Sequence, residues 1–298
     1  MTNRGPVRIV AASVIVFGII TPVLAQEPAT PTRNVSVNGR AMHVWSDGLE
    51  RRKPGQPVVI LESGAPGTLN AWRPVFGDIG RLAPVLAYDR SGLGKSEFDG
   101  ERPTVPHVAK NLHALLDAAH ISPPYVLVGA SWGGVYIRGF ASLYPTEVAG
   151  LVYLDVSDYE RTREELATFL PAMSSGPPTP PRLPDDLPPG VRAELEQVFE
   201  YGSAEFAEIR ALRLPSGLPV AVVIGGIPPG PLPPNALTTN VNILRLIQIR
   251  HQADWALSSP AGLLLVSSQA GHNVIQDVPA LVLQAVKHVL DHVAPVSR

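Results

Sequence analysis

Residues 125–144 constrain the fold of this chain more than any other stretch. An apolar run at residues 125–128 predicts a buried strand, and a second apolar run that starts at Trp132 predicts a helix. The helix is expected to end before Pro145, because proline cannot continue a helix. Between the two runs, residues 129–133 read Gly-Ala-Ser-Trp-Gly, which matches the G-x-S-x-G pattern of a nucleophile elbow. Such a turn holds its serine, here Ser131, in a strained conformation at the edge of a sheet.

The elbow pattern is short, so its context carries the argument. Its alternative interpretation is a glycine-rich turn from strand to helix in an α/β protein without a nucleophile. The elbow requires a strand directly before it and a helix directly after it, and the sequence predicts both. Its glycines also suit a place where strand and helix approach too closely for a side chain. The sequence therefore predicts that Ser131 is a nucleophile.

Apolar runs that predict buried strands alternate with helical patterns along the chain. The runs lie at residues 58–61, 84–88, 150–154, 218–224 and 263–267, and helical spacing is found at residues 105–120, 239–257 and 278–293. Residues 34–45 alternate polar and apolar side chains around Asn38 and Gly39, which predicts a β-hairpin with a type I′ turn. The alternation predicts the α/β fold class, with a doubly wound and mostly parallel sheet.

Residues 156–215 interrupt this alternation, because they contain no pattern of a buried strand. Two helical patches, roughly residues 158–170 and 191–214, flank a Pro-rich stretch at residues 171–189. We expect residues 156–215 to form a lid inserted between two strands of the sheet. The apolar side chains of the lid either line a pocket or seat the lid on the body; examples are Phe169, Met173, Phe199 and Phe206.

The first residues of the chain have the features of a secretory signal peptide. Arg4 and Arg8 precede an apolar run at residues 9–20, and small residues fit a cleavage site near Ala25. We therefore expect residues 1–25 to be removed and residues 26–298 to form one secreted or periplasmic domain, with no stable insertion in a membrane. The alternative is an uncleaved segment that tethers the protein to a membrane, but the run is short for a span and Pro22 follows it.

Composition excludes several classes of function. The formal net charge is only −2. The composition therefore predicts no strongly charged face, and nucleic acid is not an expected partner. The chain has no cysteine, so no disulfide stabilises it. His288 and His292 share one face of the last predicted helix, but no third metal ligand is evident and no H-E-x-x-H motif occurs. We predict neither a metal nor another cofactor.

One loop imitates a phosphate-binding motif. Gly94, Lys95 and Ser96 follow a predicted strand and have the ending of a P-loop. Asp89 stands where that motif needs glycine, and no amphipathic helix opens after Ser96. We interpret this loop as a structural turn.

A serine hydroxyl needs an imidazole to accept its proton and a carboxylate to orient that imidazole. In an open parallel sheet, such groups gather at the carboxyl ends of the strands. His272 follows the last strand and is the expected base, although it also fits an ordinary surface histidine. Asp155 directly follows a strand and is the first choice for the acid, although it also fits a cap of the first lid helix. Asp158 and Asp254 are the alternative acids.

The reaction also needs hydrogen-bond donors for a negatively charged oxygen. The backbone N–H of Trp132 lies at the positive start of the elbow helix. The backbone N–H of Ala65, in the loop after the strand at residues 58–61, is the expected second donor. The sequence leaves open whether the Trp132 side chain walls a pocket or packs in the core.

Four motifs at predicted strand ends resemble those of the α/β-hydrolase superfamily, and the resemblance covers nearly all of residues 26–298. The motifs are residues 63–67 (Ser-Gly-Ala-Pro-Gly), residues 89–96 (Asp-Arg-Ser-Gly-Leu-Gly-Lys-Ser), residues 129–133 and residues 271–272 (Gly-His). The resemblance implies a serine, aspartate and histidine triad in chain order, an oxyanion hole that uses Ala65 and Trp132, and a lid after the sixth strand. The sequence departs from the family at Ser63, where many members have histidine, and after the seventh strand, where no carboxylate stands.

These motifs are specific to the superfamily and not to one activity. The leading hypothesis is a secreted or periplasmic serine hydrolase that cleaves a small carboxylic ester or lactone through an acyl-enzyme. Serine at the elbow argues against the haloalkane dehalogenase and epoxide hydrolase branches, which have aspartate there. An aminopeptidase of the proline-iminopeptidase kind is an alternative, because Ala65-Pro66-Gly67 resembles the oxyanion loop of that branch; Asp185 and Asp186 offer faint support for an amine pocket. A member of the fold that binds a ligand without catalysis is the alternative from another class.

Overall fold

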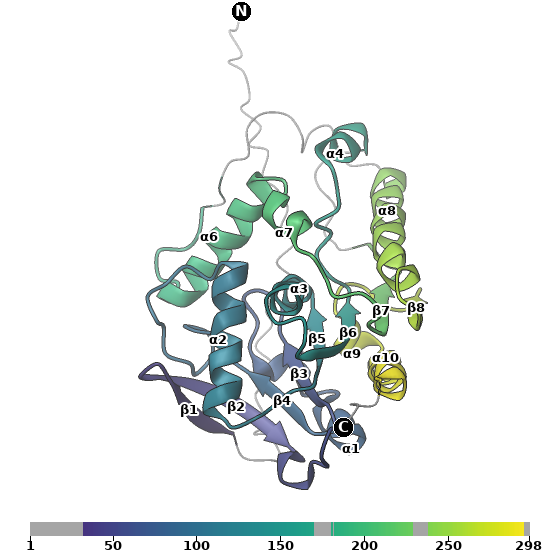
Figure 1. Ribbon diagram of the computed structural model, residues 1–298. Coiled ribbons are helices and arrows are strands. Elements are labelled where there is room, and N and C mark those ends of the chain that lie inside the picture. Colours follow the sequence, from purple (N-terminus) through teal and green to yellow (C-terminus); the bar gives the residue numbers. More distant parts are fainter. Residues whose placement is uncertain (1–31, 170–179, 181, 229–237, 295–298) are drawn as a thin grey trace, which may run out of the picture.

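The computed structural model describes residues 32–169, 180, 182–228 and 238–294. An eight-stranded sheet with the order β1-β2-β4-β3-β5-β6-β7-β8 forms its centre (Figure 1). The strands are β1 (Arg33–Val37), β2 (Arg40–Asp47), β3 (Val58–Glu62), β4 (Val85–Tyr88), β5 (Tyr125–Ala130), β6 (Val148–Leu154), β7 (Val220–Gly225) and β8 (Gly262–Ser267). β1 and β2 are antiparallel to their neighbours, and all later strands are parallel. The α/β class and the mostly parallel sheet are confirmed.

The hairpin at the start of the sheet follows the predicted turn chemistry. β1 and β2 pair from Val37 with Arg40 outward, which leaves a two-residue connection. Both residues of that connection, Asn38 and Gly39, have positive φ angles of 50° and 79°. A type I′ turn needs this geometry, and asparagine and glycine adopt it at low cost.

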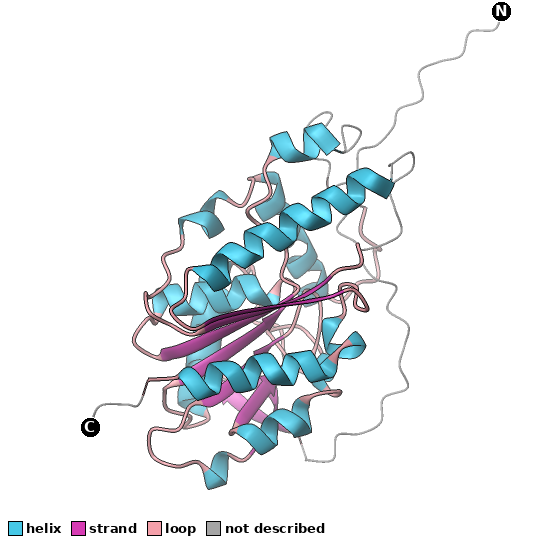
Figure 2. Cartoon of the chain, turned by 90° about the vertical axis from the view of Figure 1, so that its right-hand side faces the viewer, coloured by secondary structure: helices cyan, strands magenta, loops and turns pink. Residues whose placement is uncertain are grey.

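Helices cover both faces of the sheet (Figure 2). α2 (Val105–Ala118), α3 (Gly133–Leu143) and α8 (Thr238–Leu257) pack on one face, and α1 (Phe76–Leu82), α9 (Val274–Asp277) and α10 (Pro279–His292) pack on the other. The Thr104 hydroxyl accepts a hydrogen bond from the His107 N–H and so caps the start of α2. The described residues also contain two short 3-10 helices, Leu49–Arg51 and Leu69–Trp72.

The core has one layer on each face of the sheet. In β3 every residue is buried, and alternate side chains enter the two layers: Ile60 lies in the layer under α2 and α3, and Leu61 lies in the layer under α1 and α10. A strand buried on both faces reads as a continuous apolar run, which is why β3 to β7 were visible in the sequence. These two apolar layers hold the strands in place, and the site lies at the carboxyl ends of the strands.

The described residues between β6 and β7 contain three helices, in the segment that the sequence marks as a lid. They are α4 (Arg163–Phe169), α6 (Pro189–Ser203) and α7 (Ala207–Ala211), and Figure 1 shows them beyond one end of the sheet. The second helical patch was predicted as continuous over residues 191–214, but it breaks at Glu205 and Phe206, whose φ angles are 52° and 55°. Met173 lies outside the described residues. That the segment acts as a lid stays a prediction.

β8 is the last strand of the sheet and pairs only with β7 among the described residues. Its side chains Leu264 and Val266 remain 36% and 47% exposed. Among the described residues, none of the helices is long and apolar enough to span a membrane.

Candidate active site

The turn after β5 holds Ser131 in the left-handed region. Its φ is 51°, and its N–H donates to the Leu154 carbonyl oxygen at 2.9 Å. An added Cβ at Gly129 would lie 2.6 Å from the carbonyl oxygen of Gly133. No real side chain tolerates that distance, so the glycine is required for strand and helix to meet at this angle. The local geometry is that of the predicted elbow, with β5 extending two residues beyond the predicted strand.

Ser131, His272 and Asp155 form one hydrogen-bonded chain. His272 Nε2 lies 2.9 Å from Ser131 Oγ, and His272 Nδ1 lies 2.6 Å from Asp155 Oδ2. His272 follows β8 and its side chain is 39% exposed, whereas Asp155 follows β6 and is fully buried. The structure therefore brings together three predicted residues from three strand ends. The arrangement suits proton transfer from the serine to the imidazole.

Two donors hold the second oxygen of Asp155. Arg245 Nη2 on α8 donates to Asp155 Oδ1 at 2.6 Å, and the Gly225 N–H at the end of β7 donates to it at 3.2 Å. The Arg245 side chain is 3% exposed. Its Nε and Nη1 donate to the Gly225 carbonyl oxygen and to Gln248 Oε1. The sequence did not suggest Arg245, because Leu244 before it is buried whereas Leu246 after it is 64% exposed, so no local pattern marks it as buried.

The other predicted carboxylates lie apart from His272. Asp158 accepts a hydrogen bond at its Oδ1 from His251 on α8, at 2.9 Å, and Asp254 lies on the exposed side of that helix. Asp277, at the end of α9, accepts the Gly271 N–H at its Oδ2, at 3.0 Å. Asp277 thereby holds the residue before His272. The geometry favours Asp155 over Asp158 and Asp254.

The loop after β3 lies directly against the elbow. An added Cβ at Gly64 would lie 2.9 Å from Ser131 Cβ. The Ser63 hydroxyl donates to the Thr68 carbonyl oxygen and accepts the Trp72 Nε1–H, both at 2.9 Å. These bonds hold the loop that contains Gly64 and Ala65. Neither the Ala65 nor the Trp132 N–H makes a turn or loop hydrogen bond to another described residue.

The side chain of Trp132 packs against aromatic rings instead of facing solvent. It is 3% exposed, and its ring centroid lies 5.9 Å from that of Tyr201 on α6 and 6.1 Å from that of Phe206. Tyr136 meets it edge-on at 6.3 Å. The residue after Ser131 thus joins the elbow to the lid segment.

The loop that imitates a P-loop has its polar groups engaged within the protein. Asp89 accepts the Leu69 N–H at 2.8 Å and the Lys95 N–H at 3.0 Å. The Ser96 hydroxyl donates to the Asp89 carbonyl oxygen at 2.7 Å and accepts the His43 N–H at 2.8 Å. These contacts make it a structural turn that is held against β2 and against the 3-10 helix at Leu69–Trp72.

The two histidines of the last helix contact backbone. His288 Nε2 lies 3.1 Å from the Ala261 carbonyl oxygen, and His292 Nδ1 lies 2.8 Å from the His288 carbonyl oxygen. In the part of the chain that the structure describes, no three histidine, aspartate or glutamate side chains are grouped as metal ligands.

The fold and the elbow define the class of protein, and comparisons with known proteins agree with it. A family model described as alpha/beta hydrolase fold matches residues 57–193. A thermophilic esterase from Thermogutta terrifontis superposes with a TM-score of 0.59 at 18% identity, over 88% of this chain and 98% of that one. An epoxide hydrolase from Vigna radiata superposes with a TM-score of 0.60 at 17% identity, over the same shares. The chain has the fold of the α/β hydrolases, and residues 57–193 match the model of that family.

Curated relatives of similar sequence match only part of this chain and only part of their own length. The uncharacterized protein YqjL of Bacillus subtilis is 31% identical over 124 residues, which are 41% of this chain and 47% of that protein. Epoxide hydrolase A of Mycobacterium tuberculosis is 32% identical over 140 residues, which are 45% of this chain and 41% of that protein. The chain spans less than half the length of the curated relatives it matches.

Proposed function

We propose that this protein is a serine hydrolase that cleaves a small carboxylic ester or lactone through an acyl-enzyme. The observation that carries the proposal is the hydrogen-bonded chain from Ser131 Oγ through His272 to Asp155. A serine held at an elbow beside an imidazole is equipped for acyl transfer. Among the neighbours, the esterase of Thermogutta terrifontis carries this type of activity in its name.

The geometry supports a defined sequence of steps. Ser131 Oγ attacks the acyl carbon while His272 Nε2 accepts the hydroxyl proton, and the carbonyl electron pair moves to oxygen. The imidazolium then protonates the leaving oxygen, the carbon–oxygen bond breaks, and an alcohol departs. Water enters, gives its proton to His272 and releases the acid from Ser131 by the same steps in reverse. Asp155 stabilises the imidazolium at Nδ1 in both halves.

Two backbone N–H groups are proposed to stabilise the oxyanion, those of Ala65 and Trp132. Trp132 is the N-cap of α3, where the helix carries unpaired N–H groups and a partial positive charge. Ala65 follows Gly64, which touches Ser131. Donors fixed before the reaction need no rearrangement as charge develops, which makes such sites effective.

The aminopeptidase alternative loses its support in the lid segment. A substrate amine would need a buried carboxylate near Ser131, but Asp185 and Asp186 are both exposed. One relative is named an epoxide hydrolase, so an epoxide is included among the substrates of the test. A member that binds without catalysis remains an outcome of that test.

The test follows hydrolysis of p-nitrophenyl esters of increasing acyl length by the purified protein, with an aryl epoxide and an aminoacyl-anilide as competing substrate classes. We expect ester hydrolysis, and we expect a fluorophosphonate probe to label the parent protein at Ser131 but not the Ser131→Ala variant. Activity on the epoxide or the anilide alone would replace the proposed substrate class. A parent protein that cleaves no substrate and takes no label would overturn the proposal in favour of a binding protein.

We also propose that the protein is secreted or periplasmic and acts on a small molecule, without nucleic acid and without stable membrane insertion. Arg4, Arg8 and the apolar run at residues 9–20 support a signal peptide, and these residues lie outside the described part. N-terminal sequencing of the exported protein should begin at Gln26. A protein that keeps Met1 and sediments with membranes would instead favour the tether.

A further inference from the structure

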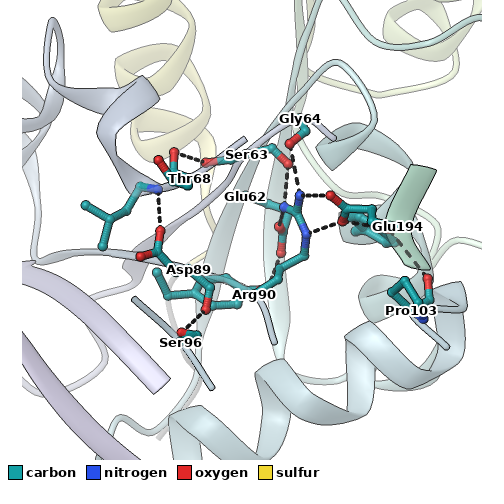
Figure 3. A network of polar contacts seen from close by, with 12 residues as sticks. Glu62, Ser63, Gly64, Thr68, Asp89, Arg90, Ser96, Pro103 and Glu194 are labelled. Carbon is teal, nitrogen blue, oxygen red and sulfur yellow. Dashed lines mark hydrogen bonds and ion pairs between the residues drawn. The ribbon is translucent and has the colours of Figure 1, made fainter. Parts of the chain in front are cut away.

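A buried ionic cluster lies beside the proposed oxyanion site, and the mechanism above does not use it. It consists of Glu62 at the end of β3, Arg90 after β4 and Glu194 on α6 (Figure 3). Arg90 Nη1 lies 2.6 Å from Glu62 Oε1, and Arg90 Nε lies 2.7 Å from Glu194 Oε1. The three side chains are 1%, 4% and 1% exposed in that order. Buried charges are costly unless paired, so their arrangement needs a reason.

Arg90 also holds the backbone of the oxyanion loop. Its Nη1 donates to the Ser63 carbonyl oxygen at 2.6 Å, and its Nη2 donates to the Gly64 carbonyl oxygen at 2.9 Å. Figure 3 shows the guanidinium between this loop and Glu194. The peptide that links Gly64 to Ala65 contains both the carbonyl held by Arg90 and the N–H proposed to bind the oxyanion. Arg90 therefore fixes the orientation of that peptide directly.

Helix α6 docks on the same loop region through contacts besides the ion pair. An added Cβ at Gly92 would lie 2.6 Å from Gly190 Cα, so two backbones touch where α6 begins. Further along α6, the Tyr201 hydroxyl accepts the Val105 N–H at 2.9 Å. Tyr136 on the elbow helix donates its hydroxyl to Glu194 Oε1 at 3.1 Å. Glu194 thus sits where α6, the elbow helix and Arg90 meet.

Glu194 acts on Arg90 through its charge as well as through packing. Burial of Arg90 alone would lower its pKa, but Glu194 and Glu62 outweigh burial and raise that pKa well above the usual value. Burial raises the pKa of Glu62, against the opposing effects of Arg90 and of the Tyr88 hydroxyl. Two carboxylates compete for one guanidinium, so the direction in which Arg90 points depends on both. Arg90 Nη2 donates both to the Gly64 carbonyl oxygen and to Glu194 Oε2, at 2.9 and 3.0 Å, so we expect loss of the Glu194 charge to turn the guanidinium toward Glu62.

We propose that Arg90 is a positioning residue that makes the oxyanion site depend on the docking of α6, with Glu194 as the contact through which docked α6 aligns the peptide before Ala65. This inference rests on the proposed function. It assigns the lid segment a role in the chemical step in addition to any role in substrate binding. A substrate that seats α6 would thereby complete the site that stabilises its own transition state.

The experiment compares Glu194→Gln and Arg90→Lys with Glu196→Gln in the full-length protein. Glu196 lies on the same helix and is 59% exposed, so its variant removes the same charge without touching Arg90. Each variant is assayed for kcat and KM on a p-nitrophenyl ester and for inhibition by an aryl trifluoromethyl ketone. In that adduct Ser131 Oγ bonds to the carbonyl carbon, the hydroxyl proton passes to His272, and the carbonyl oxygen becomes an oxyanion in the site. Thermal unfolding of each variant is measured in parallel.

For Glu194→Gln we expect kcat to fall by about tenfold with KM changed less than about twofold, and ketone affinity to fall by a factor similar to that of kcat. Arg90→Lys keeps the charge but loses the fork that reaches two carbonyl oxygens, so its loss is expected to approach the roughly hundredfold effect of one missing oxyanion donor. Glu196→Gln should match the parent protein.

A role confined to stability would lower the melting temperature of Glu194→Gln and leave kcat and ketone affinity unchanged well below that temperature. That result would overturn the inference. If Arg90→Lys fails to fold, Glu194→Gln alone decides the question. A parent protein without ester hydrolysis or phosphonate labelling refutes the proposed function itself, which is a different outcome from an active parent whose Glu194→Gln variant is equally active.

Discussion

Arg245 and Asp155 form a buried ion pair, with 2.6 Å between Nη2 and Oδ1, on the side of the carboxylate that does not face His272. The two carboxylate oxygens of Asp155 therefore have different partners: Oδ2 faces His272, and Oδ1 accepts hydrogen bonds from Arg245 and Gly225. A carboxylate held in this way keeps Oδ2 aimed at the imidazole without help from solvent, since Asp155 is fully buried. The pair replaces the hydration that an aspartate would otherwise need.

We expect Arg245→Met to destabilise the protein by about 3–5 kcal/mol, because it leaves Asp155 buried with the Gly225 N–H as the remaining donor at Oδ1. The matched control is Arg250→Met, since Arg250 lies on the same helix and is exposed. Urea unfolding followed by circular dichroism measures both. Equal midpoints for the two variants would show that the buried pair contributes nothing beyond a surface arginine.

Substitution of each of three aspartates tests which one is the acid of the triad. We expect Asp155→Asn to lower kcat by up to about 10⁴-fold, because an amide cannot stabilise the imidazolium. Asp158→Asn and Asp254→Asn should retain kcat within about threefold, because neither side chain contacts His272 in the structure. Ester hydrolysis with near-equal losses in Asp155→Asn and Asp158→Asn would contradict this assignment.

Gly133→Ala tests the close approach of the elbow to β3. An added Cβ would lie 2.7 Å from the Ser63 carbonyl oxygen and overlap the Glu62 carbonyl oxygen. Since both neighbours are backbone, we expect a loss of stability of about 3 kcal/mol, together with loss of ester hydrolysis as the oxyanion loop shifts. Gly77→Ala on α1 is the control, because a Cβ there meets nothing within 4 Å, and its effect on the free energy of unfolding should lie between none and a gain of about 1 kcal/mol.

His251 links α8 to the start of the lid segment in a pH-dependent way. The hydrogen bond to Asp158 raises the pKa of His251 above 6.5, the charges of Asp158, Glu165 and Glu160 raise it further, and burial opposes them. Because the pKa is raised in the folded state, the protonated imidazole stabilises the fold fully below about pH 6.5, and this stabilisation is lost as the pH rises through the folded-state value.

We therefore expect His251→Gln to destabilise the protein more at about pH 5.5 than at about pH 8.5. Arg161 also pairs with Asp158 and competes with the imidazole, so Arg161 is kept unchanged in both proteins. Urea unfolding of parent and variant at the two pH values gives the difference. A gap in unfolding free energy that is the same at both values would show that the pKa of His251 is the same in the folded and unfolded states.

The fold was predictable from the sequence because its signals are local. Continuous apolar runs gave β3 to β7, and the Asn38-Gly39 pair gave the first hairpin. The structure also brings Ser131, Asp155 and His272 together, as the general rule for strand ends in parallel sheets implies. What a local pattern missed was the break in the second lid patch, where Phe206 adopts a positive φ in an otherwise helical sequence.

The buried ion pairs were missed because they join segments distant in the sequence. Arg245 lies 90 residues from Asp155, and Glu194 lies 104 residues from Arg90. No periodicity reports which loop faces which helix across such separations. Single-residue signals existed nevertheless: Glu62 ends an otherwise apolar buried strand, and a carboxylate there requires a partner.

The exposed edge of β8 gives this protein a route to aggregation. Its sequence, Gly-Leu-Leu-Leu-Val-Ser, contains neither charge nor proline, and Leu264 and Val266 are only partly covered. Natural sheets usually protect their last strand from self-association with such residues. Two partly unfolded copies that meet along β8 can therefore continue the sheet across both molecules and aggregate. His272 lies in the loop after this strand, so the same event would displace the base from the site.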